Sequence, residues 1–392
     1  MSLRSLRELE SDGGILASGR DEAYGCVFGR DSLIVALQLL RAYRREHNPY
    51  YLDLTEKILR SLSSLQGRHR MIESGEEPGK IIHEYRSSKH EHLTQLLEDP
   101  WFLYPEGVLR NYDSVDSTPL FLIAVSEFER AGGNKTAVNQ LMPAVRAALR
   151  WLNSFDKFIT YEFHPERTHG GLRTQSWMDS VESVFFEKSS TAPVYPIAPV
   201  EVQAYAWSAF MRWGETDRAA RLKENFNTCF LIRHPDSVSL ASALDGSGRK
   251  LSSARSSMGH VLWASYDGEC ILDAKYRDLL RKRLLARDLF VPQAGIRTLS
   301  SRSSRFDPMS YHNGSIWPHD TAMLAEGLEN FGFTEDTQRV RDGLLNAYLY
   351  FQTPIELFSY HRGIREYAPK NGHRACRVQA WSAAALLGIL PA

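Results

Sequence analysis

The sequence predicts an all-α protein whose helices close into a single α/α barrel. Two observations lead to this prediction. Helical periodicity dominates the 392 residues while strand-like alternation is rare, and no Pro-, Gly- or Ser-rich linker divides the chain. Long loops rich in aromatic and polar residues separate the helices, and two concentric rings of helices would gather such loops at one end as a pocket. We therefore treat residues 1–392 as one domain.

The individual helices are indicated by apolar residues spaced three and four apart. Over 31–47, Leu33 and Leu40 fall on one face and charged residues occupy the other. The same pattern predicts helices over 51–65, 117–131, 136–154, 199–213, 217–231, 268–286, 319–331, 334–350 and 376–388, with short pieces near 86–97 and 258–265. Alternation predicts short strands only at 80–83 and 158–163. The helices share no repeated sequence, which argues against a TPR or HEAT array.

The composition is that of an ordinary soluble globular protein. Hydrophobic residues make up 43% and charged residues 24% of the chain. Lys and Arg number 47, as do Asp and Glu, and this zero net charge disfavours a nucleic-acid or anionic-membrane partner. The N-terminus lacks an apolar signal-peptide core, and no apolar run approaches the roughly 20 residues of a bilayer span. With four scattered cysteines, we expect reduced thiols in a cytoplasmic protein; the oligomeric state is not predicted.

Five polar segments stand outside the helix faces and are candidates for the chemistry. They are FGRDSL, PGKIIHEYR, YDSVDSTPLF, SWMDS and YHNGSIWPHD, the last followed by Glu356 in PIELF. Aromatic residues make up 11% of the chain, and many stand in these segments beside Asp, His and Arg. Flat rings among fixed polar groups suit a concave site that stacks sugars. Each segment alone also has a structural explanation, because an Asp before a helix commonly caps it.

Two other chemistries fit the sequence less well. His83 and Glu84 could begin the HExxH motif of a zinc metalloprotease, but Ser87 stands where the motif needs His. Terpene cyclases also use helical barrels, but their DDxxD and DxDD clusters do not occur in the sequence. Trp177, in contrast, stands two residues before Asp179. An aromatic neighbour that desolvates a carboxyl raises its pKa, which favours a general acid.

Taken together and in order, the motifs carry a resemblance to a known family. FGRDSL, PGKIIHEYR, YDSVDSTPLF, SWMDS, PIAPVEVQAYAW, GHVLWA and SYHNGSIWPHD resemble the catalytic domain of glycogen-debranching (amylo-α-1,6-glucosidase-like) enzymes. These enzymes belong to the six-hairpin glycosidase superfamily, which includes glucoamylases and trehalases. The resemblance extends from about Leu9 to the end of the chain. It implies an (α/α)6 barrel and an inverting glycosidase that needs no metal or other cofactor.

The resemblance also assigns roles to individual residues. Asp179 matches the general acid that protonates the glycosidic oxygen, and Glu356 matches the general base that activates water. Arg30 and Asp31 match the pair that holds the non-reducing-end sugar. Stacking and further substrate contacts are expected from Trp177, Trp317, Glu84, Asp116, His319 and Asp320.

Two departures from the debranching pattern affect the expected substrate. No β-rich domain is expected before the barrel, which favours oligosaccharides or a small glycoside over glycogen. Residues 362–377 are strongly basic, and they either form a solvated face or contact an anionic aglycone. The sequence thus predicts an inverting hydrolase of α-glucosidic bonds, including α-1,6 bonds, in oligosaccharides. The alternatives are a glycosidase for a trehalose-like or acid-linked glycoside, a phosphorolytic relative, and a non-catalytic carbohydrate-binding barrel.

Overall fold

The computed structural model describes residues 2–369 and 372–389. Six inner helices form a closed ring in which each helix packs against the next. They are α2 (Gly29–Glu46), α5 (Ser117–Arg130), α7 (Val200–Arg212), α9 (His260–Trp263), α11 (Pro318–Glu329) and α13 (Ala380–Ile389). The ring closes where α13 packs against α2. This arrangement confirms the predicted α/α barrel.

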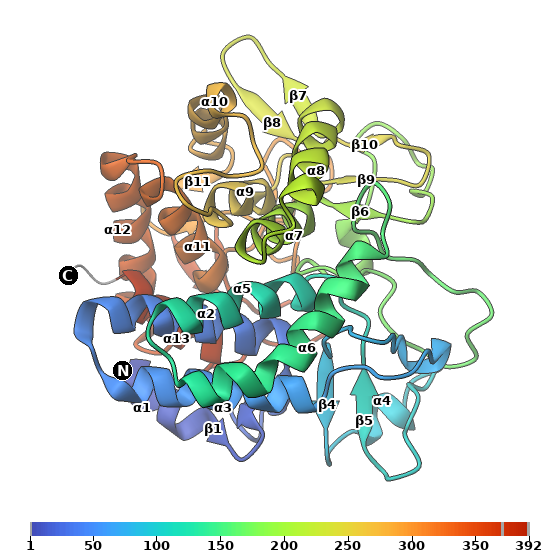
Figure 1. Cartoon of the computed structure of the whole chain (residues 1–392). Helices are drawn as coiled ribbons and strands as arrows, with labels where there is room; N and C mark the ends of the chain where they lie inside the picture. Colours follow the sequence, from blue (N-terminus) through green and yellow to red (C-terminus); the bar gives the residue numbers. More distant parts are fainter. Residues whose placement is uncertain (1, 370–371, 390–392) are drawn as a thin grey trace.

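An outer ring of helices covers the inner one. It consists of α3 (Pro49–Ser64), α6 (Lys135–Asn153), α8 (Thr216–Cys229), α10 (Ala274–Leu284), α12 (Thr334–Phe351) and α1 (Ser2–Leu9). In Figure 1, α3 and α6 lie on the outer side of α2 and α5, and the contacts of these helices agree. The remaining helical pieces are α4 (Glu91–Thr94) and the 3-10 turns η1 (Ile72–Ser74), η2 (Val181–Ser183) and η3 (Ser256–Gly259).

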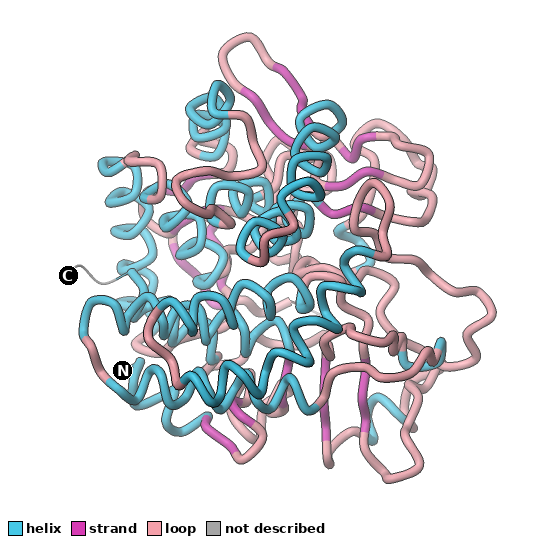
Figure 2. Tube along the Cα trace, viewed as in Figure 1, coloured by secondary structure: helices cyan, strands magenta, loops and turns pink. Residues whose placement is uncertain are grey.

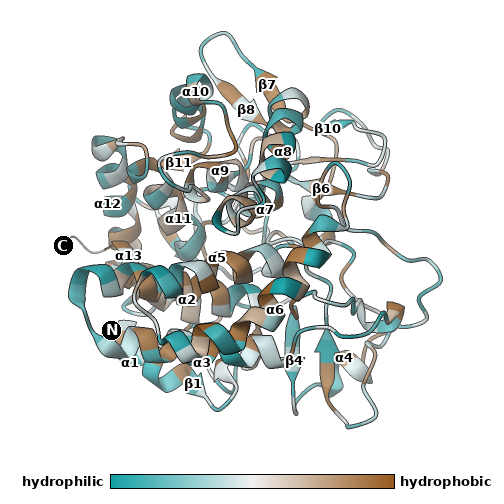
Figure 3. Ribbon diagram, in the orientation of Figure 1, coloured by the Kyte–Doolittle hydropathy of each residue, from teal (hydrophilic) through white to brown (hydrophobic). Residues whose placement is uncertain are grey.

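The two rings differ in how much of each helix they bury. Every residue of α11 except Glu329 is buried, whereas α8 buries one stripe that includes Leu222 and Phe226. A helix that is apolar on all sides belongs in the interior, and a helix with a single apolar stripe packs at the surface. Figure 3 shows the same contrast between the hydrophobic α5 and the more hydrophilic α10 and α12.

Short antiparallel strands lie in the loops between the helices, and Figure 2 shows most of them around the margin of the helical body. The three-stranded sheets are β3 (Val27–Phe28), β4 (Glu84–Arg86) and β5 (Leu109–Asn111), and β10 (Lys250–Leu251), β9 (Ala243–Leu244) and β6 (Ala198–Pro199). The two-stranded pairs are β1 (Glu10–Ser11) with β2 (Gly14–Ile15), β7 (Leu231–Arg233) with β8 (Val238–Leu240), β11 (Phe290–Val291) with β12 (Gly295–Ile296), and β13 (Phe358–Tyr360) with β14 (Ile364–Glu366). Because β3 runs directly into α2 and places Phe28 opposite Glu84, its sheet fixes one wall of the barrel mouth.

Ion pairs connect the inner helices at the opposite end of the barrel. Glu127 near the end of α5 pairs with Arg44 of α2 and with Arg212 of α7. Arg41 of α2 pairs with Glu329 of α11. These contacts connect the C-terminal ends of four inner helices.

The predicted helices are largely confirmed, with corrections at several ends. The helix expected over 268–286 spans only α10, because the residues before Asp273 form a turn with positive φ at Asp267 and Gly268, followed by buried bends. The helix expected over 376–388 begins at Ala380, because the backbone of Cys376 pairs instead with that of Glu356. The piece near 86–97 shrinks to α4, and α1 is an addition.

The two strand predictions are wrong in detail. The strand expected at 80–83 lies at β4, three to four residues later, where it pairs on both sides. The segment 158–163 forms only an isolated bridge between Tyr161 and Ile197. No helix in the described residues is both long and apolar enough to span a bilayer.

Candidate active site

A pocket of about 390 Å³ lies at the end of the barrel where the inner helices begin. Arg30 and Asp31 in the first turn of α2, Trp317 before α11 and Trp381 in the first turn of α13 line it. The rest of the wall is formed by Ala23, Tyr24, Phe28, His83, Glu84, Arg86, His92, Leu93, Trp101, Leu172, Trp177, Asp179, Tyr311, His312, Glu356, His373 and Gln379. Rings beside charged groups offer stacking faces for a sugar and partners for its hydroxyls.

Asp179 presents a carboxyl group to this pocket from the loop between α6 and α7. Its Oδ2 accepts a hydrogen bond from Nη1 of Arg30 at 3.2 Å, while Nε of Arg30 donates to Oδ2 of Asp116 at 2.6 Å. One quarter (25%) of the Asp179 side-chain surface stays exposed. Burial, together with the charge of Asp116, raises the pKa of Asp179 to about 6 against the opposing charge of Arg30. A carboxyl that is partly protonated near neutral pH can serve as a general acid.

Glu356 lies in the segment between α12 and β13 and is only 1% exposed. The hydroxyl of Tyr311 donates to its Oε1, and the backbone N–H of Cys376 donates to its Oε2 at 2.7 Å. The hydroxyl of Tyr24 lies 3.1 Å from that of Tyr311. The two donors come from separate segments and hold the carboxylate in one orientation at the pocket wall. A fixed acceptor of this kind is suited to take a proton from a bound water.

Asp31 supplies a third carboxyl group to the pocket. Gln379 donates from Nε2 to its Oδ1 at 3.2 Å. Burial raises the pKa of Asp31 to about 7; the charge of Arg30 opposes this, and the charges of Asp179 and Glu356 add to it. All three carboxyl groups therefore lie close enough to influence one another around a single cavity.

The residues expected at the substrate divide into two layers. Those that line the pocket are Arg30, Asp31, Glu84, Trp177, Asp179, Trp317 and Glu356. Behind the wall lie three more, and each is held by a protein partner. Asp116 binds Arg30, Asp320 accepts from Nε2 of His260 at 2.7 Å, and His319 stacks on Trp381 with ring centroids 3.7 Å apart.

The structure thus places Asp116, His319 and Asp320 behind the wall, and their expected contact with substrate stays a prediction. Their side chains are at most 1% exposed and are packed against the residues that form the wall. Asp116 holds Arg30 and His319 stacks on Trp381, both of which line the pocket, whereas Asp320 is bound to His260; none of the three is among the residues that line the cavity. Arg30 lines the pocket as expected, but its guanidinium is bound to two carboxylates and orients Asp179.

Several residues that build the site were missed by sequence reasoning. Tyr311 orients Glu356, and Nδ1 of His312 lies 2.8 Å from the hydroxyl of Ser180, next to the acid. Burial, with nearby Arg255 and Arg30, keeps the pKa of His312 well below its ordinary value, so this ring is neutral. Both residues stand in the segment YHNGSIWPHD, where the cluster of aromatic and polar residues was a usable signal. Cys376 acts through its backbone and gave no such signal.

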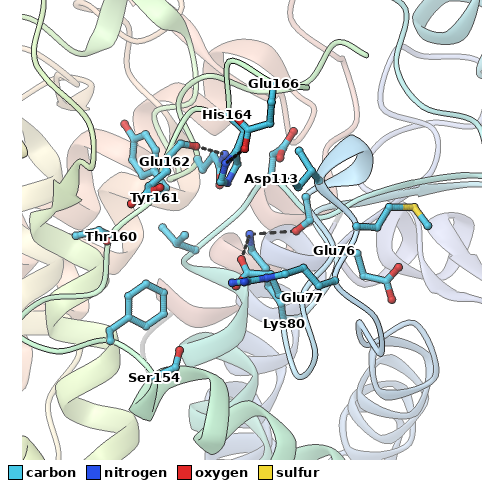
Figure 4. Close-up of a pocket in the computed structure, with 17 residues that line it drawn as sticks. Glu76, Glu77, Lys80, Asp113, Ser154, Thr160, Tyr161, Glu162, His164 and Glu166 are labelled. Atoms are coloured by element: carbon cyan, nitrogen blue, oxygen red, sulfur yellow. Dashed lines mark hydrogen bonds and ion pairs between the residues drawn. The ribbon is translucent and has the colours of Figure 1, made fainter. Parts of the chain in front are cut away.

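A second cavity, of about 500 Å³, is shown in Figure 4. Several of its charged groups are paired within the protein. Nζ of Lys80 lies 3.3 Å from Oε1 of Glu77, and the two oxygens of Asp113 accept from Nη1 of Arg167 at 3.0 and 2.9 Å. The cavity that holds Asp179 and Glu356 is therefore the stronger candidate for an active site.

Comparison with known proteins finds similarity to glycoside hydrolases. Residues 204–374 match the family model of the mannosylglycerate hydrolase MGH1-like glycoside hydrolase domain. The matched range includes Tyr311, Glu356 and His373, and Asp179 lies outside it. No curated protein sequence matches the chain.

Solved glycoside hydrolases resemble the chain over its whole length. A GH63 mannosylglycerate hydrolase from Thermus thermophilus in complex with Tris and D-glycerate has a TM-score of 0.65 at 14% identity, covering 99% of this chain and 98% of that one. A mannosylglycerate hydrolase from the same organism in complex with glucose gives 0.63, at the same identity and coverage. A glycosidase variant in complex with glucose gives 0.59 at 13% identity, covering 99% and 94%.

The chain has the fold of these glycoside hydrolases. That fold is the (α/α)6 barrel, as the resemblance to six-hairpin glycosidases implied. The relatives are named for mannosylglycerate hydrolysis or simply as glycosidases, and none of these names refers to glycogen debranching.

Proposed function

We propose that the chain is an inverting glycoside hydrolase in which Asp179 is the general acid and Glu356 the general base. One observation carries the proposal: two carboxyl groups line one aromatic pocket and are held by different partners. Burial raises the pKa of Asp179 to about 6, whereas Glu356 accepts hydrogen bonds from Tyr311 and from the backbone of Cys376. Pairs whose environments differ in this way divide into acid and base.

The chemistry follows from these positions. Asp179 gives its proton to the glycosidic oxygen as the bond from that oxygen to the anomeric carbon breaks. Glu356 takes a proton from a water that attacks the same carbon from the opposite face of the sugar. The products are a sugar of inverted configuration and the free alcohol of the aglycone. An inverting pair needs carboxyl groups about 6.5–9.5 Å apart to leave room for the water.

The substrate we favour is a small glycoside whose aglycone carries a carboxylate. The pocket is small, and the guanidinium of Arg86, which pairs with Glu84, and the imidazole of His373 add nitrogen-bearing side chains to its wall. Relatives in fold are named for hydrolysis of mannosylglycerate, and one is named as a complex with D-glycerate. An α-glucosidic oligosaccharide, including one with α-1,6 bonds, is the second candidate, because relatives of the same fold are named as complexes with glucose.

Proton NMR during the first minutes of hydrolysis tests the proposal. The substrates are the α-mannoside and the α-glucoside of D-glycerate, together with isomaltose, panose, maltose and trehalose. The β-anomer of the free sugar should appear first, with the glycerate glycosides turned over fastest. The α-anomer appearing first would contradict the inverting mechanism, and a sugar phosphate formed only with phosphate present would indicate a phosphorolytic enzyme. Binding without turnover of any substrate would indicate a carbohydrate-binding barrel.

A further inference from the structure

Three side chains with metal-ligating atoms meet at the edge of the pocket. They are Glu356, His373 and Cys376, and one atom from each lies within 4.8 Å of the other two. Among the residues that the structure describes, this is the one group of three or more His, Cys, Asp or Glu side chains with that spacing. We propose that these three residues bind Zn²⁺ and that the bound ion inhibits the enzyme. The inhibition rests on the proposed function, whereas the binding does not.

The spacing of the donor atoms is close to that of a zinc site. Nε2 of His373 lies 3.7 Å from Oε2 of Glu356 and 4.0 Å from Sγ of Cys376. With bonds of about 2.0–2.3 Å in tetrahedral geometry, ligand atoms stand roughly 3.3–3.6 Å apart. Nε2 of His373 therefore needs to approach the other two donors by only a few tenths of an ångström, and the donor atoms of Glu356 and Cys376 already lie within 4.8 Å of each other. His373 can make this adjustment because its side chain is 36% exposed, while Glu356 and Cys376 are buried and fixed.

The chemistry of the three donors selects zinc over the hard cations. Zn²⁺ takes thiolate, imidazole and carboxylate ligands, whereas Mg²⁺ and Ca²⁺ prefer sets of oxygen atoms. When Zn²⁺ binds, the thiol of Cys376 forms a bond to the metal and its proton passes to solvent. The thiolate and the Glu356 carboxylate then balance the two positive charges, and His373 binds as neutral imidazole. Cys376 is available for this step because it forms no disulfide.

Binding at this place removes the base from the reaction. The Oε2 of Glu356 would hold the metal and could not accept the proton of the attacking water. Tyr311 would keep its hydrogen bond to Oε1, so the rest of the pocket would remain assembled. The fourth position of the ion would lie toward the pocket that both Glu356 and His373 line, and a bound sugar would compete with the metal for this space.

The binding is tested by calorimetry with Zn²⁺ alone on the chelator-treated, reduced full chain. The wild type should bind one Zn²⁺, and Cys376→Ser and His373→Gln should each bind it at least tenfold more weakly. Cys229→Ser, a half-buried cysteine on α8, is the matched control and should bind like the wild type. Co²⁺ should produce a thiolate charge-transfer absorption in the near ultraviolet that Cys376→Ser lacks. Equal Zn²⁺ affinity in Cys376→Ser and the wild type would overturn the site.

The inhibition is tested on whichever glycoside is turned over. Saturating Zn²⁺ should lower kcat/KM at least tenfold in the wild type and in Cys229→Ser, and a chelator should restore it. The loss should be under twofold in Cys376→Ser at the same Zn²⁺ concentration. Thermal melts of all variants show whether a lost effect reflects unfolding. Full activity of a zinc-loaded wild type would overturn the inhibitory role. If no glycoside is hydrolysed, the inhibitory role fails together with the proposed function, and the calorimetry still decides whether the zinc site exists.

Discussion

Changing Asp179 to Asn should abolish hydrolysis of glycosides with poor leaving groups and spare those with good ones. The side chain keeps its size, but it can no longer give a proton to the glycosidic oxygen. Positioned general acids contribute about 10²–10⁴-fold in rate, so we expect a loss of that order on an alkyl glycoside. A glycoside with a 2,4-dinitrophenyl leaving group needs no protonation, and its loss should be tenfold or less.

The pKa of Asp179 also predicts how the rate depends on pH if Asp179 is the general acid. Because the pKa of Asp179 is about 6, half of the molecules carry the proton at pH 6, about a tenth at pH 7 and about a hundredth at pH 8. The value of kcat/KM for wild type on an alkyl glycoside should therefore fall about tenfold per pH unit above pH 6. On the dinitrophenyl glycoside this alkaline decline should disappear.

Initial rates between pH 5 and 9 on the two substrates test both statements. The pKa of Asp31 is raised to about 7, so Asp31 is the rival source of an alkaline decline. Asp31→Asn serves as the control: it should bind sugar poorly and yet keep the decline on the alkyl glycoside. An unchanged decline with the dinitrophenyl glycoside, or equal losses on both substrates in Asp179→Asn, would refute Asp179 as the acid.

Three further predictions concern stability. Folding raises the pKa of Asp31 from 3.8 to about 7, so the ionised side chain destabilises the fold above pH 7, and this destabilisation disappears as the pH falls to 4. Asp31→Asn should therefore raise the free energy of unfolding by up to about 4 kcal/mol at pH 8 but barely at pH 4. Urea titrations at the two pH values measure the difference. A Cβ on Gly29 would lie 2.0 Å from the carbonyl oxygen of Ile82, so Gly29→Ala should destabilise the fold by about 2–4 kcal/mol in the same assay, and a smaller loss would show that the first turn of α2 can shift. Glu127→Ala leaves two arginines unpaired at the far end of the barrel; it should cost about 1–3 kcal/mol with KM unchanged, and a raised KM would contradict the separation of that end from the site.

The barrel could be predicted from the sequence because its helices carry their own signals. Inner helices such as α5 are apolar over nearly their whole surface, and outer helices such as α3 have a single stripe. The short strands could not be predicted, because two or three residues have no readable period. The strand β4 exists because β3 and β5 flank it, and this pairing of distant segments is not encoded locally.

Residues of the candidate site were predictable from the sequence where they stand in a distinctive motif. Residues that act through their backbone, or that support a pocket side chain without lining the pocket, were not. Asp179 and Glu356 were proposed from SWMDS and PIELF, and both line the pocket. Asp320 was expected at the substrate from the family resemblance, but it is fully buried and bound to His260. Sequence spacing does not distinguish the wall of a pocket from the layer that supports it. That distinction depends on which side chains in the first turn of an inner helix point into the pocket.

The supporting layer explains how an acid can be held by an arginine without losing its proton. Arg30 lies 2.6 Å from Asp116 and 3.2 Å from Asp179, so most of its charge is balanced by the buried Asp116. Asp116 also raises the pKa of Asp179 by direct repulsion. Asp116→Asn removes both effects and leaves the full charge of Arg30 to Asp179, so the pKa of Asp179 should fall and the alkaline decline should move below pH 6. An alkaline decline that stays near pH 6 in a folded Asp116→Asn variant would show that burial alone raises the pKa of Asp179. Asp116 would then serve only to hold Arg30.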